Sequence, residues 1–497
     1  MIRFSERVRA PVAPKSPFRH GAAAAPAPSH SEPNPRRPRA SRVLGLCAFC
    51  FARANPLPRI RRTVRGSKPT EEVKVDKGLW MACLAAIPGS FQYGFGLSVI
   101  NVPQAAVCRS LGLAQTSLTW SSLVAVLSPS GLLGAWLAPS AVRRLGLVTA
   151  LCGTSIFFLI SGALFPFAAQ AAAQSQLSLA TALFASGRVM AGLGAGAATV
   201  FVPLYLGRIA PLQLRGAIGN LHQVAIVLGL LVAQLAGAAL PWPRTLALAA
   251  LFGALQLLLM PWLREVPEET TDSAPIGGFG ALGSSELRRP MAMAVALMAL
   301  QQYCGINGVW YYSTSFFTEA GLPNPLAGTL VSSAIFMVAT LVAVPLIEKA
   351  GRRSLLLRGQ TSAAIALSIL TASLCAKAAG GLGFTDGLLN GATLMSVIAF
   401  VVSFAISLGP IPWQIANEIF PLRCRAEAQC VIASLCEIFS ASVALGFPVL
   451  QRILGARLAF LPSVVVLLLG YLYVRKNLPE TKNREVKDIL SDFNRRR

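Results

Sequence analysis

Long apolar stretches dominate this chain from residue 81 to residue 474. A hydrocarbon core of roughly 30 Å is crossed by about 20 apolar residues in a helix. Hydrophobic residues make up 54% of the chain and charged residues only 13%, which is more apolar surface than a soluble domain needs. The pattern predicts an all-α membrane protein with twelve transmembrane helices, near residues 81–104, 116–140, 147–169, 179–207, 216–239, 245–263, 291–317, 326–347, 357–380, 388–412, 428–451 and 456–474.

The formal net charge of +24 would also suit a nucleic-acid-binding protein. The basic residues, however, gather in the amino-terminal tail, in the short loops at Arg143-Arg144 and Arg352-Arg353, and at the carboxyl end. An excess of Lys and Arg in short loops marks the cytosolic side of a membrane protein. We therefore expect a multi-pass integral membrane protein with both termini in the cytosol, most simply in the plasma membrane, and no nucleic-acid partner.

Residues 1–76 differ in kind, being rich in Pro, Ala and Arg and poor in acids. This composition predicts a disordered basic tail. An ordinary cytosolic tail, a transit peptide and a misassigned start codon all remain open. Cys47 and Cys50 form a lone CxxC pair without the second pair that a zinc site requires, so no metal site is predicted.

The chain repeats a motif at long period. Arg208, Pro211 and Arg215 follow the fourth apolar stretch, and Glu418, Pro421 and Arg425 follow the tenth with the same spacing. Transporters built from two parallel repeats place their substrate near the bilayer midplane, between the halves. We expect an amino-terminal six-helix bundle over 77–263, a short cytosolic connector over 264–290, a carboxyl-terminal bundle over 291–476 and a cytosolic tail over 477–497.

The seventh apolar stretch carries unusual polar side chains. Gln301, Gln302 and Asn307 are followed by Tyr311 and Tyr312 within a run that opens at Met291. Amides at bilayer depth are costly unless they face a cavity and meet a ligand or water. The cluster therefore indicates transport.

Several short motifs, taken together and in order, resemble those of the facilitative glucose transporters, which are the sugar-porter branch of the major facilitator superfamily. The resemblance covers about 80–482 and implies a major facilitator fold with two six-helix bundles, alternating access, no enzymatic activity and no cofactor. The motifs are Gly89-Ser90-Phe91-Gln92-Tyr93-Gly94, Val99-Ile100-Asn101, Gly187-Arg188, Arg215-Gly216, Leu221-His222-Gln223, Gln301-Gln302 through Ser315, Gly351-Arg352-Arg353, Gly409-Pro410-Ile411-Pro412-Trp413 and Pro479-Glu480-Thr481-Lys482.

The resemblance implies a sugar site and a gate. An amide donates and accepts hydrogen bonds without a charge that would trap a sugar, and an aromatic face packs against the apolar side of a pyranose ring. The alternative is that these amides only hold helices together. The implied ligands are Gln223, Gln301, Gln302, Asn307 and Trp413, and the implied extracellular gate is Tyr311 and Tyr312.

A cytosolic charge network is also implied, formed by Glu348, Arg352, Arg353, Glu418 and Arg425 together with Arg188 and Arg215. The amino half departs from the family pattern. Leu147 and Val148 stand where the family has two arginines, and Arg208 occupies a position that is normally glutamate. Since such contacts shut the cytosolic face, we expect a resting state weighted toward the inward-facing conformation.

Three departures leave the substrate open. Phe336 and Ala405 replace polar pocket residues, and Glu437 occupies the place of a cavity-facing tryptophan. Proton-coupled relatives carry a carboxylate in the first span, where this chain has Gly96. The residues favour a facilitative uniporter for D-glucose, with fructose next. A proton symporter with Glu437 as its coupling carboxylate, and a non-transporting sugar sensor, are the alternatives.

Overall fold

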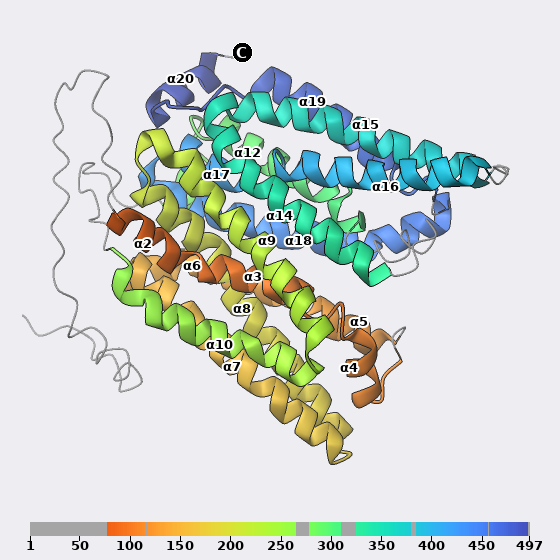
Figure 1. The fold of residues 1–497 in the computed structure, drawn as a ribbon. Helices are drawn as coiled ribbons and strands as arrows, with labels where there is room; N and C mark the ends of the chain where they lie inside the picture. Colours follow the sequence, from red (N-terminus) through yellow and green to blue (C-terminus); the bar gives the residue numbers. More distant parts are fainter. Residues whose placement is uncertain are drawn as a thin grey trace, which may run out of the picture. The chain divides into compact units, whose positions relative to one another are not determined.

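The computed structural model describes residues 77–114, 117–264, 278–309, 325–378, 384–455 and 457–495. These residues belong to one compact unit, and all their regular secondary structure is helical (Figure 1). The predicted tail over 1–76 lies outside the described residues, as do Tyr311 and Tyr312.

The described residues of the amino half, 77–264, form seven longer helices and several short ones. These are α2 (Lys77–Ala86), α3 (Pro88–Ser98), α4 (Gln104–Ser110), α5 (Leu118–Ala125), α6 (Leu127–Leu145), α7 (Leu147–Ala173), α8 (Leu177–Ile209), the 3-10 turn η2 (Leu212–Leu214), α9 (Arg215–Ala239), α10 (Trp242–Leu259) and the 3-10 turn η3 (Met260–Trp262).

The described residues of the carboxyl half, 278–495, continue the helical pattern. The elements are α11 (Phe279–Leu282), α12 (Arg288–Tyr303), α14 (Pro325–Ala350), α15 (Arg352–Ala378), α16 (Phe384–Ala405), α17 (Ile411–Ile419), the 3-10 turn η4 (Leu422–Cys424), α18 (Arg425–Leu454), α19 (Leu461–Asn477) and α20 (Val486–Arg495).

Nine helices within the described ranges are long and apolar enough to cross a membrane. The other three predicted spans are not among these nine helices. The first is divided into α2 and α3 at Ile87, directly before Pro88, because proline cannot donate an amide bond within a helix. The seventh continues from α12 into residues outside the described ranges, and α19 has 17 residues.

The long-period repeat predicted from the sequence has a structural counterpart. Pro211 has φ −58° and ψ 152°, and Pro421 has φ −60° and ψ 153°. Each proline is followed by a 3-10 turn, after which Arg215 begins α9 and Arg425 begins α18. The same spacing of residues therefore folds into the same turn in both halves.

Helices pack closely where glycine removes a side chain. A Cβ atom on Gly94 of α3 would lie 1.9 Å from the carbonyl oxygen of Ile226 in α9, and one on Gly196 of α8 would lie 1.9 Å from that of Gly131 in α6. Small residues at such crossings are typical of membrane helix bundles. Several helix pairs join the amino and carboxyl halves, chiefly α9 with α14 and α6 with α18.

The outer surface is apolar. Leu258 is 70% exposed, Leu445 is 73% exposed and Ile453 is 74% exposed. Many other large apolar side chains are also exposed, among them Leu118, Trp136, Phe167, Val338 and Leu388. Such an exterior suits hydrocarbon rather than water.

Candidate functional site: a charged face and a buried amide cluster

One end of the helix assembly carries most of the predicted charge network. We call this end the charged face; it comprises Arg143, Arg208, Arg215, Glu348, Arg352, Arg353, Glu418, Arg425 and Glu427. Arg352 at the start of α15 is its centre: its Nη2 atom lies 2.8 Å from Oε1 of Glu418, and its Nη1 atom lies 3.4 Å from Oε2 of Glu348. Arg352 and Glu418 are both buried, so this pair is largely shielded from water.

Glu348 carries the network from one half to the other. Its Oε1 atom accepts a hydrogen bond of 2.9 Å from the main-chain amide of Ala217, in the first turn of α9. Gly216 permits the approach, because a Cβ atom there would lie 2.3 Å from Nη2 of Arg352. A carboxylate at a helix amino terminus also meets the positive end of the helix dipole.

The segment after α19, which contains Glu480 and Thr481, stabilises the charge network through hydrogen bonds. Glu480 accepts hydrogen bonds from the main-chain amides of Arg352 and Arg353, at 2.8 and 3.1 Å. The hydroxyl of Thr481 donates to the second oxygen of Glu418. The sequence motif around Glu480 therefore fixes the turn that presents Arg352.

The other predicted members have different partners. Arg353 donates to the carbonyl of Arg475 at 2.7 Å. Arg425 is buried and donates to the carbonyl of Phe420 at 3.1 Å, and its charged neighbours are Arg208, Arg215 and Glu418. The charged face thus concentrates cations around Arg425.

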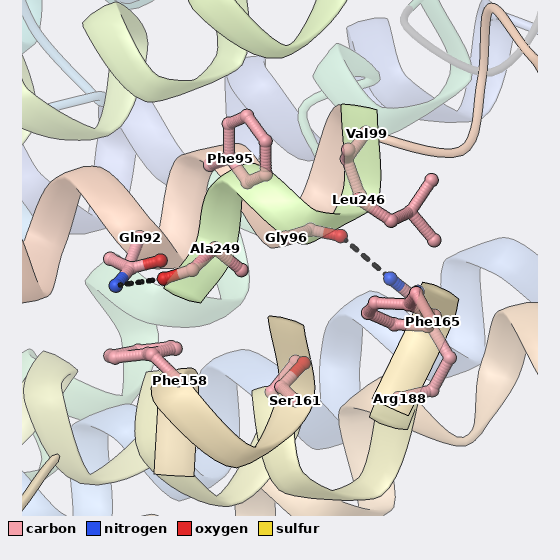
Figure 2. Close-up of a pocket in the computed structure, with 11 residues that line it drawn as sticks. Gln92, Phe95, Gly96, Val99, Phe158, Ser161, Phe165, Arg188, Leu246 and Ala249 are labelled. Carbon is pink, nitrogen blue, oxygen red and sulfur yellow. Dashed lines mark hydrogen bonds between the residues drawn. The ribbon is translucent and has the colours of Figure 1, made fainter. Parts of the chain in front are cut away.

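Arg188 does not belong to the charged face, and this part of the sequence prediction is wrong. It precedes Arg208 on α8 by 20 residues, which is roughly 30 Å of helix. Its guanidinium donates to the carbonyl of Gly96 at 2.9 Å (Figure 2). It also donates to the carbonyl of Val124 at 3.2 Å. The motif identified the residue but not its depth along the helix.

The two halves touch at the charged face, whereas the sequence suggested an inward-facing state. Nη1 of Arg143 in α6 lies 2.7 Å from Oε1 of Glu427 in α18. The side-chain amide of Asn417 in α17 donates to the carbonyl of Pro203 in α8 at 2.8 Å. Together with the bond between Glu348 and Ala217, these contacts join the two halves at the charged face.

The amide cluster lies where two helices break. α12 ends at Tyr303 and is followed by Gly305, whose φ of +100° suits only glycine. α16 ends at Ala405 and α17 begins at Ile411. Nε2 of Gln301 donates to the carbonyls of Leu408 and Gly409, both at 2.8 Å, so Gln301 satisfies carbonyls that the second break leaves without helical partners.

Three amides form a hydrogen-bonded chain. Nδ2 of Asn307 donates to Oε1 of Gln302 at 2.7 Å, and Nε2 of Gln302 donates to Oε1 of Gln301 at 3.2 Å. Gln302 also lies 3.1 Å from Sγ of Cys436 in α18. Gln301 and Gln302 are buried, and Asn307 is half-buried. Asn307 is therefore the most exposed of the three hydrogen-bonded amides.

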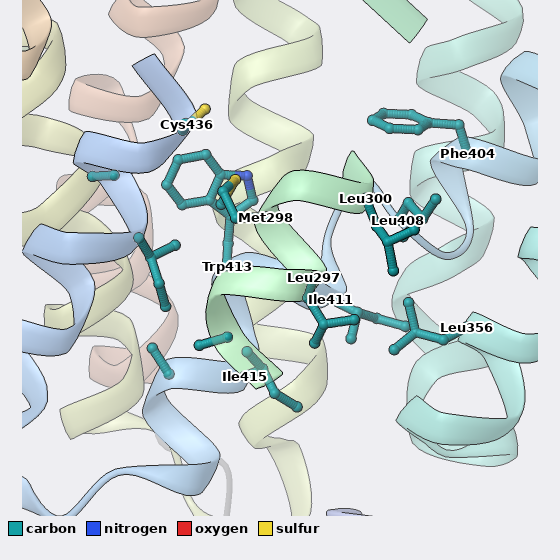
Figure 3. Close-up of a cluster of buried hydrophobic side chains, with 14 of the residues drawn as sticks. Leu297, Met298, Leu300, Leu356, Phe404, Leu408, Ile411, Trp413, Ile415 and Cys436 are labelled. Atoms are coloured by element: carbon teal, nitrogen blue, oxygen red, sulfur yellow. The ribbon is translucent and has the colours of Figure 1, made fainter. Parts of the chain in front are cut away.

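Trp413 and Gln223 complete the predicted set. The Trp413 ring lies edge-on to the ring of His222 in α9, with centroids 5.2 Å apart. The next residue, Gln223, makes no hydrogen bond to any described residue, and its Nε2 atom would lie 3.4 Å from a Cβ on Gly409. Figure 3 shows Trp413 and Cys436 on one side of α12, with Phe404 and Leu356 on the other.

Glu437 lies between the halves. Its carboxyl lies near the hydroxyls of Ser128 and Tyr93 in the amino half. Gly131 of α6 leaves room for it, since a Cβ there would lie 3.2 Å from the Glu437 carboxyl carbon. Phe336 and Ala405 are buried, and Phe336 packs against Phe404 with ring centroids 6.0 Å apart, so this side of the cluster is dry.

Comparison with known proteins identifies the family. The profile of the family described as "Sugar (and other) transporter" matches residues 82–268 and 279–493. The chain belongs to the sugar transporter family. The match spans both halves and almost all described helices, so the whole helical unit is covered.

Curated members of the sugar transporter family are similar over most of their length. The mouse (Mus musculus) solute carrier family 2, facilitated glucose transporter member 4, is 31% identical over 482 residues, which cover 85% of this chain and 92% of the relative. The rat (Rattus norvegicus) member 3 of the same family is 29% identical over 479 residues, covering 84% and 94%. These relatives are transporters and not enzymes, as the sequence predicted.

Solved structures confirm the major facilitator fold. The proton:xylose symporter XylE bound to 6-bromo-6-deoxy-D-glucose superposes with a TM-score of 0.68 at 20% identity, over 83% of this chain and 98% of that one. FucP in the outward conformation gives 0.60 at 14% identity, over 80% and 99%. At these identities the likeness shows the fold of this sugar transporter.

Sequence reasoning missed several polar residues of this family member. Glu427 and Asn417 contact the opposite half, yet nothing in their local sequence marks them. The sequence identified Arg143 as a basic loop residue but not its contact with Glu427. Gln414 is buried directly after Trp413, and neither polar atom of its amide has a described partner. Its place next to the tryptophan motif was the one available signal.

Proposed function

We propose that this chain is a facilitative hexose transporter that works by alternating access. In this proposal the amino-terminal bundle over 77–263 and the carboxyl-terminal bundle over 291–476 rock against each other, linked by the connector over 264–290. The cargo is a neutral hexose, with D-glucose first and fructose second. The supporting observation is the chain of amides from Asn307 to Gln301, set between two helix breaks and beside Trp413.

Each predicted ligand has a distinct part in this proposal. The side-chain nitrogen of Gln301 donates to two main-chain carbonyls. In this state Gln301 therefore orients the amide cluster and has no free donor for a sugar hydroxyl. Gln223 and Asn307 are the amides best placed to meet hydroxyls, because a glutamine or asparagine side chain both donates and accepts. The Trp413 ring would pack against the apolar face of the sugar ring.

Passive transport is favoured by the distribution of acids. Residues 77–264 contain no Asp or Glu. Proton coupling requires a titratable group whose protonation depends on both the substrate and the conformational change. Residues 77–264 have no carboxylate that could fill this role. Sugar would therefore move only down its own gradient.

Glu437 supports a second candidate, a proton-coupled sugar symporter. This carboxyl belongs to α18 but meets Ser128 and Tyr93 of the amino half. A group that contacts both halves would lose partners when the halves move apart. It is thus the one described acid near the amide cluster whose surroundings depend on the transport cycle.

The proposed setting is the plasma membrane, with both termini in the cytosol and Tyr311 and Tyr312 as the gate on the opposite side. The basic residues of the charged face support this orientation, because Lys and Arg are retained on the cytosolic side. The charged face would then be the cytosolic gate. Labelling of single cysteines introduced into the tail and into the α7–α8 loop, in intact cells, tests the topology.

Uptake of labelled D-glucose into liposomes that contain the purified protein tests the function. We expect saturable uptake that unlabelled D-glucose abolishes and that fructose reduces more weakly. A panel of hexoses as competitors then ranks the substrates. Binding of hexose without flux would favour a sensor, and neither binding nor flux for any hexose would contradict the proposal.

A further inference from the structure

Arg188 is the most buried cation of the amino half. The residue belongs to α8 and is 2% exposed. Two of its nitrogen atoms donate to main-chain carbonyls, those of Gly96 at 2.9 Å and Val124 at 3.2 Å. The third, Nε, has no described hydrogen-bond partner. Both contacts are neutral dipoles, so no carboxylate of the described residues matches the charge of Arg188.

The surrounding sequence offers no acid. Residues 77–264 form the described helices of the amino half and contain no Asp or Glu. Buried charges in proteins are paired with an opposite charge or bound to an ion. A buried guanidinium inside an acid-free bundle therefore calls for a counter-ion from outside the bundle.

A cavity lies beside this guanidinium (Figure 2). Its volume is about 20 Å³, and its lining comes from α3, α7, α8 and α10. Besides Arg188, the polar lining side chains are Ser161 and Gln92, and Oε1 of Gln92 has no described partner. A cavity of more than about 10–15 Å³ accepts a water-sized occupant, whereas a hexose is far larger. No residue of the amide cluster lines the cavity, so the two are separate.

Gly96 keeps the cavity open. It lines the cavity, and a Cβ atom built on it would meet nothing within 4 Å. The backbone carbonyl of the same residue holds Arg188 in place. Space remains at the point where a side chain on α3 would otherwise reach the guanidinium.

Glu437 of the carboxyl half does not fill this role. Its neighbours Tyr93 and Ser128 lie three residues before Gly96 and four residues after Val124, about one helical turn away in each case. Arg188 makes no recorded contact with it. The guanidinium thus bonds within the amino half, about one helical turn from the residues that face the Glu437 carboxyl.

We propose that the cavity beside Arg188 binds a small monovalent anion, of which chloride is the abundant example. The anion neutralises Arg188 and accepts the hydrogen that Nε offers. It stabilises the packing of α3, α7, α8 and α10 in the amino half. Hexose transport then depends on halide through the stability of this bundle and not through contact with the sugar.

Thermal unfolding of the full chain in detergent provides the test, in sodium chloride against sodium gluconate at equal ionic strength. A ligand that binds only the folded state raises the melting temperature by mass action, here by about 1–3 °C. We expect this difference in the parent and in Arg109→Gln. Arg109 is exposed and also donates to a carbonyl, that of Ala105, so it is the matched control.

Two variants locate the effect. Arg188→Gln removes the charge, and Gly96→Asp supplies a carboxylate within the open space; both should lose the chloride-dependent shift. If Arg188→Gln fails to fold, Gly96→Asp still tests the anion site, because this variant keeps Arg188 and supplies it with a carboxylate in place of the anion. An equal melting temperature of the parent in both salts, or a shift that persists in either variant, would overturn the proposal.

A crystal soaked in sodium bromide gives a direct view. We expect an anomalous scattering peak in the cavity between Arg188 and Gly96. Ordered water alone in that position would refute the anion site. Neither readout uses sugar flux, so this proposal can fail while the transport function stands, and the reverse is equally true.

Discussion

Arg143 in α6 and Glu427 in α18 form an ion pair of 2.7 Å that joins the two halves at the charged face. The Arg143 side chain is 38% exposed, whereas that of Glu427 is 2% exposed. One end of the pair is thus hydrated, and the other is held in a dry interface. Separation of the halves at this face would break the pair.

Removal of this ion pair should favour opening at the charged face. Partly exposed pairs contribute about 0.2–1 kcal/mol, so Arg143→Gln should raise the open population by up to about five-fold. The readout is the labelling rate of a cysteine introduced at the rim of the cavity on this face. The neighbouring exposed arginine variant, Arg144→Gln, is the control, and an equal acceleration in both would show that the pair has no such role.

Gln301→Leu should weaken hexose uptake. The change leaves the carbonyls of Leu408 and Gly409 unpaired, at about 1–3 kcal/mol per lost partner, and it frees Gln302 from its acceptor. We expect the half-saturation concentration for influx to rise by roughly ten-fold.

Gln256→Leu is the matched control for Gln301→Leu. Gln256 is also a buried glutamine that donates to a main-chain carbonyl, that of Leu151 at 3.1 Å, but it lies in α10. Its replacement should lower stability and leave the half-saturation concentration unchanged. If correctly inserted Gln301→Leu protein kept the parent half-saturation, the assignment of Gln301 would be wrong.

Glu437 should act through hydrogen bonds. Glu437→Gln retains groups that can bond Ser128 and Tyr93, whereas Glu437→Leu removes them at a cost of about 1–3 kcal/mol. We therefore expect saturable uptake to persist in Glu437→Gln and to fall in Glu437→Leu. Sugar-induced alkalinisation outside the vesicles, lost in Glu437→Gln, would instead make Glu437 a proton carrier.

Gly94→Ala should destabilise the amino half. The added methyl group would lie 1.9 Å from the carbonyl oxygen of Ile226, and overpacking of this kind costs about 1–3 kcal/mol. Gly153→Ala in α7 is the control, because a Cβ there meets nothing within 4 Å. The melting temperature in detergent should fall for the first variant and hold for the second; equal values would contradict the close crossing of α3 and α9.

Local chemistry made parts of the structure predictable. The turns at Pro211 and Pro421 follow from proline geometry and from the repeated spacing, and the apolar stretches follow from hydropathy. The ion pair between Arg143 and Glu427 joins residues 284 apart in the chain, and no local pattern encodes such a contact. The same limit applies to the bonds from Gln301 to the carbonyls of Leu408 and Gly409, which arise only where two helix breaks meet.

Arg188 illustrates a different limit. The Gly187-Arg188 motif identified a residue of importance, but a motif carries no information on depth in the membrane. Counting helical rise from Arg208 would have placed it near the other end of α8. Its place beside a cavity in an acid-free bundle became visible only when α3, α7, α8 and α10 were packed together.

The central claim is passive hexose transport, and the final level of uptake in liposomes tests it most directly. Labelled D-glucose should enter until its internal concentration equals the external one, with or without an inward proton gradient. Accumulation above the external concentration when the gradient is imposed, or uptake no faster than in protein-free liposomes, would contradict the account.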